Sequence, residues 1–136
     1  LTTTEFESPG SGTGQIITEI SDACLQCICL VESGCNVNAP CGNGGASCGP
    51  YQIDVGYWID GGAQGRDWLN CVQRFQCASN TVRGYMRKWA TIEKIGYCPT
   101  CRDYARIHDG GPGGQNLAST LAYWRKIQGK GCNEFS

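Results

Sequence analysis

The spacing of apolar residues along the chain predicts a mainly helical protein. From residue 20 onward, apolar side chains recur at the three- and four-residue spacing of amphipathic helices in several separate segments. The strongest of these helices is expected to begin at a cap on Ser79 or Asn80 and to carry an apolar stripe of Val82, Tyr85, Met86 and Trp89. This stripe is expected to pack in the core.

Four shorter helical segments are also expected. Asp22 can cap a helix that runs to about Glu32, and Asp67 can begin a short helical turn before Cys71. A further helix is expected at 100–108, before a Gly-Gly-Pro stop, and a last one from Asn116 to Gly129.

The segments between the helices contain turn residues. Residues 35–53 are rich in Gly, Asn and Pro, and Asn43-Gly44 favours a small β-hairpin that ends at 49–53. Residues 54–65 are aromatic and glycine-rich. Their glycines match neither a phosphate loop nor a dinucleotide fingerprint, so nucleotide binding is excluded.

Residues 1–15 are expected to form a flexible tail. The segment LTTTEFESPGSGTGQ contains few apolar side chains, which bury too little surface to offset the entropy lost on ordering. A single domain is therefore predicted at 16–136, a length typical of one domain.

Eleven cysteines in 136 residues predict a disulfide-rich protein from an oxidising compartment, and hence a secreted one. The alternative is zinc, since two Cys-x-x-Cys pairs occur at 24–27 and 98–101. About 70 residues separate these pairs, against about 15–20 in ribbon-type zinc sites. No metal or other cofactor is therefore predicted.

The charge balance indicates no charged macromolecular partner. The chain has 11 basic and 12 acidic residues and a formal net charge of −1. Such a chain is attracted neither to nucleic acid nor to an anionic membrane surface. No apolar run approaches the roughly 18 residues of a membrane span.

Four sequence blocks resemble the invertebrate-type lysozymes, the group that includes the leech destabilases. They are CLQCICLVESGC, SCGPYQIDVGYWID, TVRGYMRKWAT and CRDYARIHDGGPGG, and the similarity covers about residues 21 to 134. The resemblance implies an α+β, lysozyme-like fold that is mainly helical, with a small β-hairpin and several disulfides. It also implies cleavage of the β-1,4 bond between N-acetylmuramic acid and N-acetylglucosamine in peptidoglycan.

By this resemblance Glu32, in the Glu-Ser-Gly motif, is the proton donor. The end of a helix and the apolar neighbours Leu30 and Val31 should both disfavour its charged form and raise its pKa, as a general acid requires. Without the matched motif, a surface glutamate that ends a helix would be the simpler interpretation.

The chain departs from the family at the second catalytic carboxylate. Active members carry an Asp between the cysteines that correspond to Cys41 and Cys48, where this chain has only Gly-Asn-Gly-Gly-Ala-Ser. Asn43 lacks the required charge. Asp54, Asp60 or Asp67 could instead activate a water molecule, and Asp54 is the nearest in sequence. The activity is expected to be weak or lost, and a catalytically silent glycan-binding or matrix protein is the alternative.

The expected partner is peptidoglycan or a chitooligosaccharide, in a cleft lined by residues that stack or form hydrogen bonds: Tyr51, Gln52, Tyr57, Trp58 and His108. Isopeptidase activity, also attributed to the family, would need Ser47 as nucleophile with a basic partner. The usual Lys is replaced by Asp54, which leaves His108 as the candidate base. This third function is the least supported.

The resemblance also implies a disulfide pairing, which sequence alone leaves open. The implied pairs are Cys24–Cys101, Cys27–Cys132, Cys29–Cys35, Cys41–Cys48 and Cys71–Cys77. Three cysteines of active relatives are replaced here, by Gly61, by Thr81 and by a residue near Gln115. The last loss leaves Cys98 as the odd cysteine, expected to be either buried or joined to a partner molecule.

Overall fold

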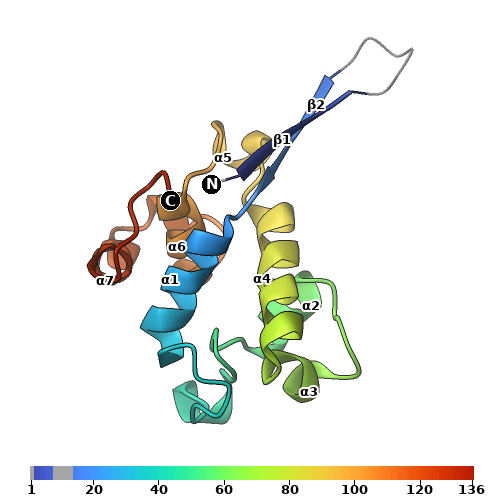
Figure 1. Cartoon of the computed structure of the whole chain (residues 1–136), viewed down its shortest axis with the longest axis vertical. Coiled ribbons are helices and arrows are strands. Elements are labelled where there is room, and N and C mark those ends of the chain that lie inside the picture. Colours follow the sequence, from blue (N-terminus) through green and yellow to red (C-terminus); the bar gives the residue numbers. More distant parts are fainter. Residues whose placement is uncertain (1, 8–13) are drawn as a thin grey trace.

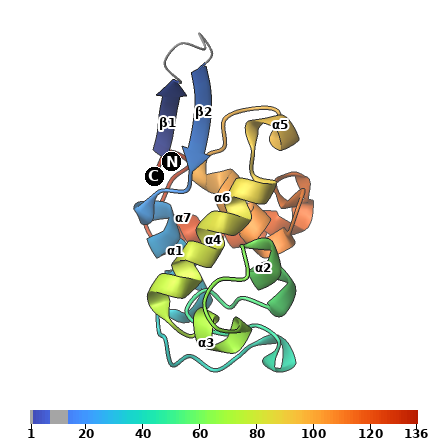
Figure 2. The same ribbon diagram turned by 90° about the vertical axis from the view of Figure 1, so that its right-hand side faces the viewer.

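The structure is a computed structural model that describes the backbone of residues 2–7 and 14–136 and the side chains from Thr18 onward. Helices α1 (Asp22–Ser33) and α4 (Phe75–Trp89) are the two longest, and a β-hairpin projects beyond one end of the helical body (Figures 1 and 2). The expected fold class, mainly helical with little β-structure and several disulfides, is confirmed.

Helix α1 begins at Asp22, and its cap is Ser21, one residue before the predicted cap. The hydroxyl oxygen of Ser21, not the Asp22 carboxylate, accepts the N-terminal hydrogen bond, from the amide of Cys24 at 3.0 Å. The helix ends at Gly34, whose φ of 69° is the left-handed conformation that glycine adopts readily. The helix therefore carries Glu32 in its last turn, as predicted.

Helix α4 begins four residues before Ser79, at Phe75, and no side chain caps it. Three residues of its apolar stripe, Val82, Tyr85 and Met86, are buried, and Trp89 is partly buried against the core. The helix packs against α2 (Val55–Asp60), α3 (Trp68–Val72) and α6 (Cys101–Gly110). The predicted cap was wrong because Ser79 is itself buried, and its hydroxyl donates to the carbonyl of Gln76 within the helix.

Two short helices were not predicted. Helix α2 (Val55–Asp60) lies in the aromatic, glycine-rich segment 54–65, and the Asp54 side chain caps it. Helix α5 (Ile92–Ile95) begins at Thr91. The short helix α3 (Trp68–Val72), capped by Asp67, is confirmed.

The C-terminal part contains helices α6 (Cys101–Gly110) and α7 (Leu121–Gly129), which pack against each other. Thr100 and Asp103 form a reciprocal capping box at the start of α6. Asn116 does not cap α7, because two 3-10 turns, Gly114–Asn116 and Ala118–Thr120, precede that helix.

Strands β1 (Thr2–Glu7) and β2 (Gly14–Glu19) pair in antiparallel register, with Thr2 opposite Glu19. This hairpin takes up most of the segment expected to be a flexible tail, in which no strand was predicted. The remaining tail residues, 1 and 8–13, lie outside the described residues, and flexibility of the segment stays a prediction. The hairpin expected at 35–53 is reduced to two isolated bridges, Gly42 to Ser47 and Cys48 to Ile53.

Five disulfides stabilise the helical body, and they join the same pairs that the resemblance implies: Cys24–Cys101, Cys27–Cys132, Cys29–Cys35, Cys41–Cys48 and Cys71–Cys77. Three of the four cysteines in the two Cys-x-x-Cys pairs are thus bonded in disulfides. Cys98 belongs to none of these five bonds and is exposed, so the first of its two predicted alternatives, burial, is not observed, and a bond to a partner molecule stays a prediction. Gly61 lies directly against Thr81, since a Cβ atom added at position 61 would lie 2.7 Å from the Thr81 Cγ2 atom.

Within the part of the chain that the structure describes, no helix has the length and apolar character needed to cross a membrane.

Candidate functional site

Glu32 lines a polar cavity of about 300 Å³, here called the Glu32 cavity. The last turn of α1 contributes Glu32, the end of α6 contributes a histidine and an aspartate, and the segment between α1 and α2 contributes the rest. The lining residues are Glu32, Gly42, Asn43, Ser47, Gln52, Asp54, His108 and Asp109. Carboxylates, neutral hydrogen-bonding groups and an imidazole thus face one concave site.

Two side chains contact the Glu32 carboxylate. The phenol O–H of Tyr123, on α7, donates to Glu32 Oε2 at 2.7 Å. The Nε2 atom of His108 lies 3.4 Å from the same oxygen. The Glu32 side chain remains 20% exposed, so it is oriented by these contacts and still accessible from the cavity.

The pKa of Glu32 is lowered, contrary to the sequence-based expectation. Burial raises it, but hydrogen bonds from His108 and Tyr123, together with the positive charges of His108 and Lys126, lower it more. The prediction considered only the helix end and the apolar neighbours Leu30 and Val31. It was wrong because residues of α6 and α7 supply hydrogen-bond donors and positive charge that stabilise the ionised carboxylate.

His108 is held by two tyrosines, and its side chain is only 3% exposed. Its Nδ1 atom lies 2.8 Å from the phenol oxygen of Tyr57, and its Nε2 atom lies 3.0 Å from the backbone carbonyl of Tyr51. The neutral imidazole with hydrogen on Nε2 satisfies both contacts. The charge of His108 therefore lowers the pKa of Glu32 only when the ring is protonated, whereas Tyr123 lowers it independently of that ring.

The loop between Cys41 and Cys48 faces the Glu32 cavity with uncharged groups. The Gly42 amide donates to Gln52 Oε1 at 2.9 Å, and Asn43 Nδ2 donates to the Ser47 hydroxyl oxygen at 3.0 Å. Ser47 and His108 line the same cavity, but both ring nitrogens of His108 already contact Tyr57 and Tyr51. The arrangement offers hydrogen bonds to a ligand. It gives little support to an isopeptidase in which Ser47 is the nucleophile and His108 the base.

Of the three predicted substitutes for the missing carboxylate, only Asp54 lines the Glu32 cavity. Its Oδ1 atom accepts a hydrogen bond from the Tyr57 amide at 2.8 Å, which fixes the side chain at the start of α2. Asp60 is instead bonded to Lys88 and Trp89, and Asp67 caps α3.

The predicted aromatic lining of a sugar cleft is not found around Glu32. Tyr51 is 1% exposed and its side chain lines a different pocket. Tyr57 stacks on Tyr85 with the ring centroids 3.6 Å apart, and its phenol oxygen contacts His108. Trp58 donates its indole N–H to the Gln64 carbonyl. Only Gln52 and His108 of the predicted set line the cavity, because the aromatic rings are used in packing.

Sequence reasoning missed two residues of this site, Tyr123 and Asp109. Asp109 directly follows His108 and lines the cavity, and burial and the negative charge of Glu32 raise its pKa. Tyr123 is 91 positions away from Glu32. Adjacency to His108 could have indicated Asp109, whereas no local signal indicates Tyr123.

Comparisons with known proteins identify similar chains. A family profile described as Destabilase matches residues 21–130. A lysozyme of Ostrea edulis is 45% identical over 116 residues, which are 84% of this chain and 83% of the relative. A lysozyme of Magallana gigas is 46% identical over 115 residues, with 84% and 82% covered. The crystal structure of Tapes japonica lysozyme aligns with a TM-score of 0.76 and 40% identity, covering 85% of this chain and 95% of that one.

Proposed function

Because the chain belongs to the destabilase family of invertebrate-type lysozymes, we propose that it is a secreted peptidoglycan β-1,4 glycoside hydrolase with Glu32 as general acid. The main support is the position of Glu32, oriented by Tyr123 and His108 and still accessible in a polar cavity. Helix α1, tied to α6 by the Cys24–Cys101 disulfide, holds this carboxylate in place.

In the proposed reaction, protonated Glu32 donates its proton to the glycosidic oxygen as the bond to the anomeric carbon breaks. The carboxylate left behind is stabilised by the hydrogen bond from Tyr123 and by the neighbouring His108. The lowered pKa leaves Glu32 largely ionised at neutral pH. The rate should therefore rise as the pH falls toward the pKa of Glu32.

Asp54 is the proposed partner of Glu32. It is exposed at the cavity and fixed through its Oδ1 atom, so it can accept a proton from a water molecule that attacks the sugar. That role corresponds to an inverting mechanism. The loop at 42–47 carries no charged side chain that could stabilise the cationic transition state. Its absence should raise the activation barrier by several kcal/mol and lower the rate about 10³-fold. The proposed enzyme is therefore slow.

The proposal is tested by clearing of peptidoglycan suspensions with wild type, Glu32→Gln and Asp54→Asn, each measured between pH 4 and 8. Slow clearing by wild type and background clearing by Glu32→Gln are expected. Glu93→Gln, on the exposed helix α5, is the matched control and should retain full activity. Equal background clearing by wild type and Glu32→Gln would refute catalysis.

A catalytically silent glycan-binding protein is the second candidate. It is favoured by the neutral hydrogen-bonding groups of Asn43, Ser47 and Gln52, which line the cavity together with Glu32. Retained binding of a chitooligosaccharide by a protein without clearing activity would identify this function.

A further inference from the structure

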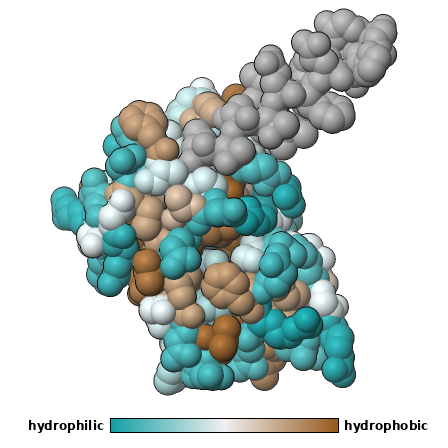
Figure 3. All heavy atoms as spheres, viewed as in Figure 1, coloured by the Kyte–Doolittle hydropathy of each residue, from teal (hydrophilic) through white to brown (hydrophobic). Residues whose placement is uncertain are grey.

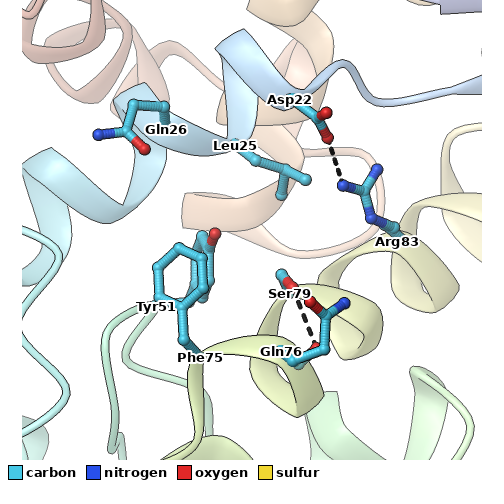
Figure 4. Close-up of a pocket in the computed structure, with 8 residues that line it drawn as sticks. All are labelled: Asp22, Leu25, Gln26, Tyr51, Phe75, Gln76, Ser79 and Arg83. Atoms are coloured by element: carbon cyan, nitrogen blue, oxygen red, sulfur yellow. Dashed lines mark hydrogen bonds and ion pairs between the residues drawn. The ribbon is translucent and has the colours of Figure 1, made fainter.

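A second pocket lies between α1 and the first turns of α4, and no residue lines both it and the Glu32 cavity. Its volume is about 290 Å³, and Tyr51 lines it beside Phe75, so it is called the Tyr51 pocket (Figure 4). Tyr51 and Gln52 are neighbours in the chain, yet their side chains line different pockets. The segment that contains them therefore separates the two sites.

The Tyr51 pocket has an apolar wall. The rings of Tyr51 and Phe75 lie 5.8 Å apart with an interplanar angle of 42°, and Leu25 of α1 faces them (Figure 4). Phe75 is 42% exposed although it is a large apolar side chain. Figure 3 shows, on the face seen in Figure 1, apolar atoms recessed between hydrophilic side chains. This wall offers an aromatic surface to a ligand from solvent.

Polar groups of both kinds surround the wall. Arg83 and Asp22 form an ion pair at 2.5 Å on one side, so their charges cancel within the pocket. Gln26, Gln76 and Ser79 add neutral donors and acceptors. A net-neutral rim with mixed hydrogen-bonding groups suits a ligand that carries many hydroxyl or amide groups and no charge.

The phenol group of Tyr51 adds a hydrogen-bonding atom to the lining of this pocket. Tyr51 is 1% exposed, and burial raises its pKa to about 12. Figure 4 shows its phenol oxygen directed into the pocket. A hydroxyl or amide group of a bound molecule could form a hydrogen bond with this oxygen.

We propose that the Tyr51 pocket binds one pyranose ring of a neutral glycan, as a second saccharide site outside the Glu32 cavity. The C–H face of such a ring packs on Phe75, its hydroxyl groups meet Gln26, Gln76 and the ion pair, and the Tyr51 hydroxyl bonds to it from below. The volume matches the lower end of small-ligand pockets, which fits one ring and not a longer segment. The choice of a chitooligosaccharide as probe rests on the proposed function. The argument from the geometry of the Tyr51 pocket is independent of that function.

The test is a titration with tri-N-acetylchitotriose, followed by amide chemical shifts in the Glu32→Gln background, in which the proposed turnover is removed. Two groups of amides should shift with separate dissociation constants. One group is Asn43 and Ser47 at the Glu32 cavity, and the other is Gln76 and Ser79 at the Tyr51 pocket.

Phe75→Ala should weaken the binding at the Tyr51 pocket about tenfold or more and leave the Glu32 cavity unchanged. Tyr51→Phe, which removes only the phenol oxygen, should weaken the same binding and preserve the fold. Phe135→Ala is the matched control, since Phe135 is 76% exposed elsewhere, and it should change neither constant.

Unchanged Gln76 and Ser79 amides at saturating trisaccharide would overturn the inference, as would equal shifts in Phe75→Ala. Shifts that depend on protein concentration without sugar would also overturn it, because a second copy of the chain would then be the occupant. Binding at the Tyr51 pocket without shifts at the Glu32 cavity would support this inference and count against the proposed catalysis.

Discussion

Replacing Tyr123 by Phe tests how the protein sets the protonation of Glu32. The change removes only the O–H that donates to Glu32 Oε2 at 2.7 Å, and the ring stays in its largely buried site. A hydrogen bond to a charged group contributes about 1.5–3 kcal/mol, against about 1 kcal/mol for a neutral pair. Its loss therefore penalises the ionised form by about 1–2 kcal/mol more than the protonated form.

The sign of the change follows from this difference. The pKa of Glu32 should rise in Tyr123→Phe, so a larger fraction of the acid is protonated at neutral pH. A penalty of about 1–2 kcal/mol corresponds to about 5–30-fold more of the acidic form, and the clearing rate at neutral pH should increase by up to that factor. The variant should also unfold more easily at neutral pH, and this loss of stability should diminish as the pH falls through the folded-state pKa of Glu32.

The assay is direct titration of the Glu32 carboxyl carbon by NMR, together with the pH dependence of clearing. Tyr97→Phe is the matched control, since the Tyr97 O–H donates to Asp103 Oδ1 at 2.6 Å outside the cavity. The control should leave the titration of Glu32 unchanged. An unshifted or lower pKa of Glu32 in Tyr123→Phe would refute the electrostatic reasoning.

Three further changes have defined outcomes. Asn43→Asp places an acid on the cavity loop, at a φ of 53° that Asp tolerates. This change should raise the clearing rate by about 10²-fold or more, whereas the control Asn38→Asp should leave the rate unchanged. Replacing Cys24 and Cys101 together by Ala opens a 77-residue loop and should lower the free energy of unfolding by about 4 kcal/mol in denaturant titrations; no change would contradict the chain-entropy estimate. Gly49→Ala should lower the free energy of unfolding by about 3 kcal/mol or more in the same assay. The φ of Gly49 is 82°, and the new Cβ atom would lie 1.7 Å from a backbone carbonyl oxygen of α3. Near-wild-type stability would contradict this prediction.

Sequence signals predicted the helices whose capping residue and repeating apolar residues lie close together in the chain. Asp67 and Thr100 mark the starts of α3 and α6, and the stripe of α4 is buried as expected. Helix α2 was missed because it has only six residues, including Gly56, and its cap Asp54 was considered only as a candidate base. Its brevity leaves too few positions for an apolar period to appear.

The candidate site was predictable only in part, since its chemistry depends on residues far apart in the chain. Glu32, Asp54 and His108 were predicted because they lie in the sequence blocks that resemble the lysozyme family, and all three line one cavity. The direction of the pKa shift at Glu32 could not be obtained from its neighbours in sequence, because Tyr123 and Lys126 reach it from α7. The disulfide pairing likewise came from resemblance, not from spacing.

The Cys27–Cys132 bond joins the first long helix to the region just before the C-terminus, 105 positions away. A protease that cuts one peptide bond anywhere between these two sulfurs leaves both fragments attached to each other. Digestive or microbial proteases would thus produce a nicked molecule of unchanged mass except for one added water, and the pieces would separate only after reduction. The covalent framework of the protein therefore outlasts a single backbone cut.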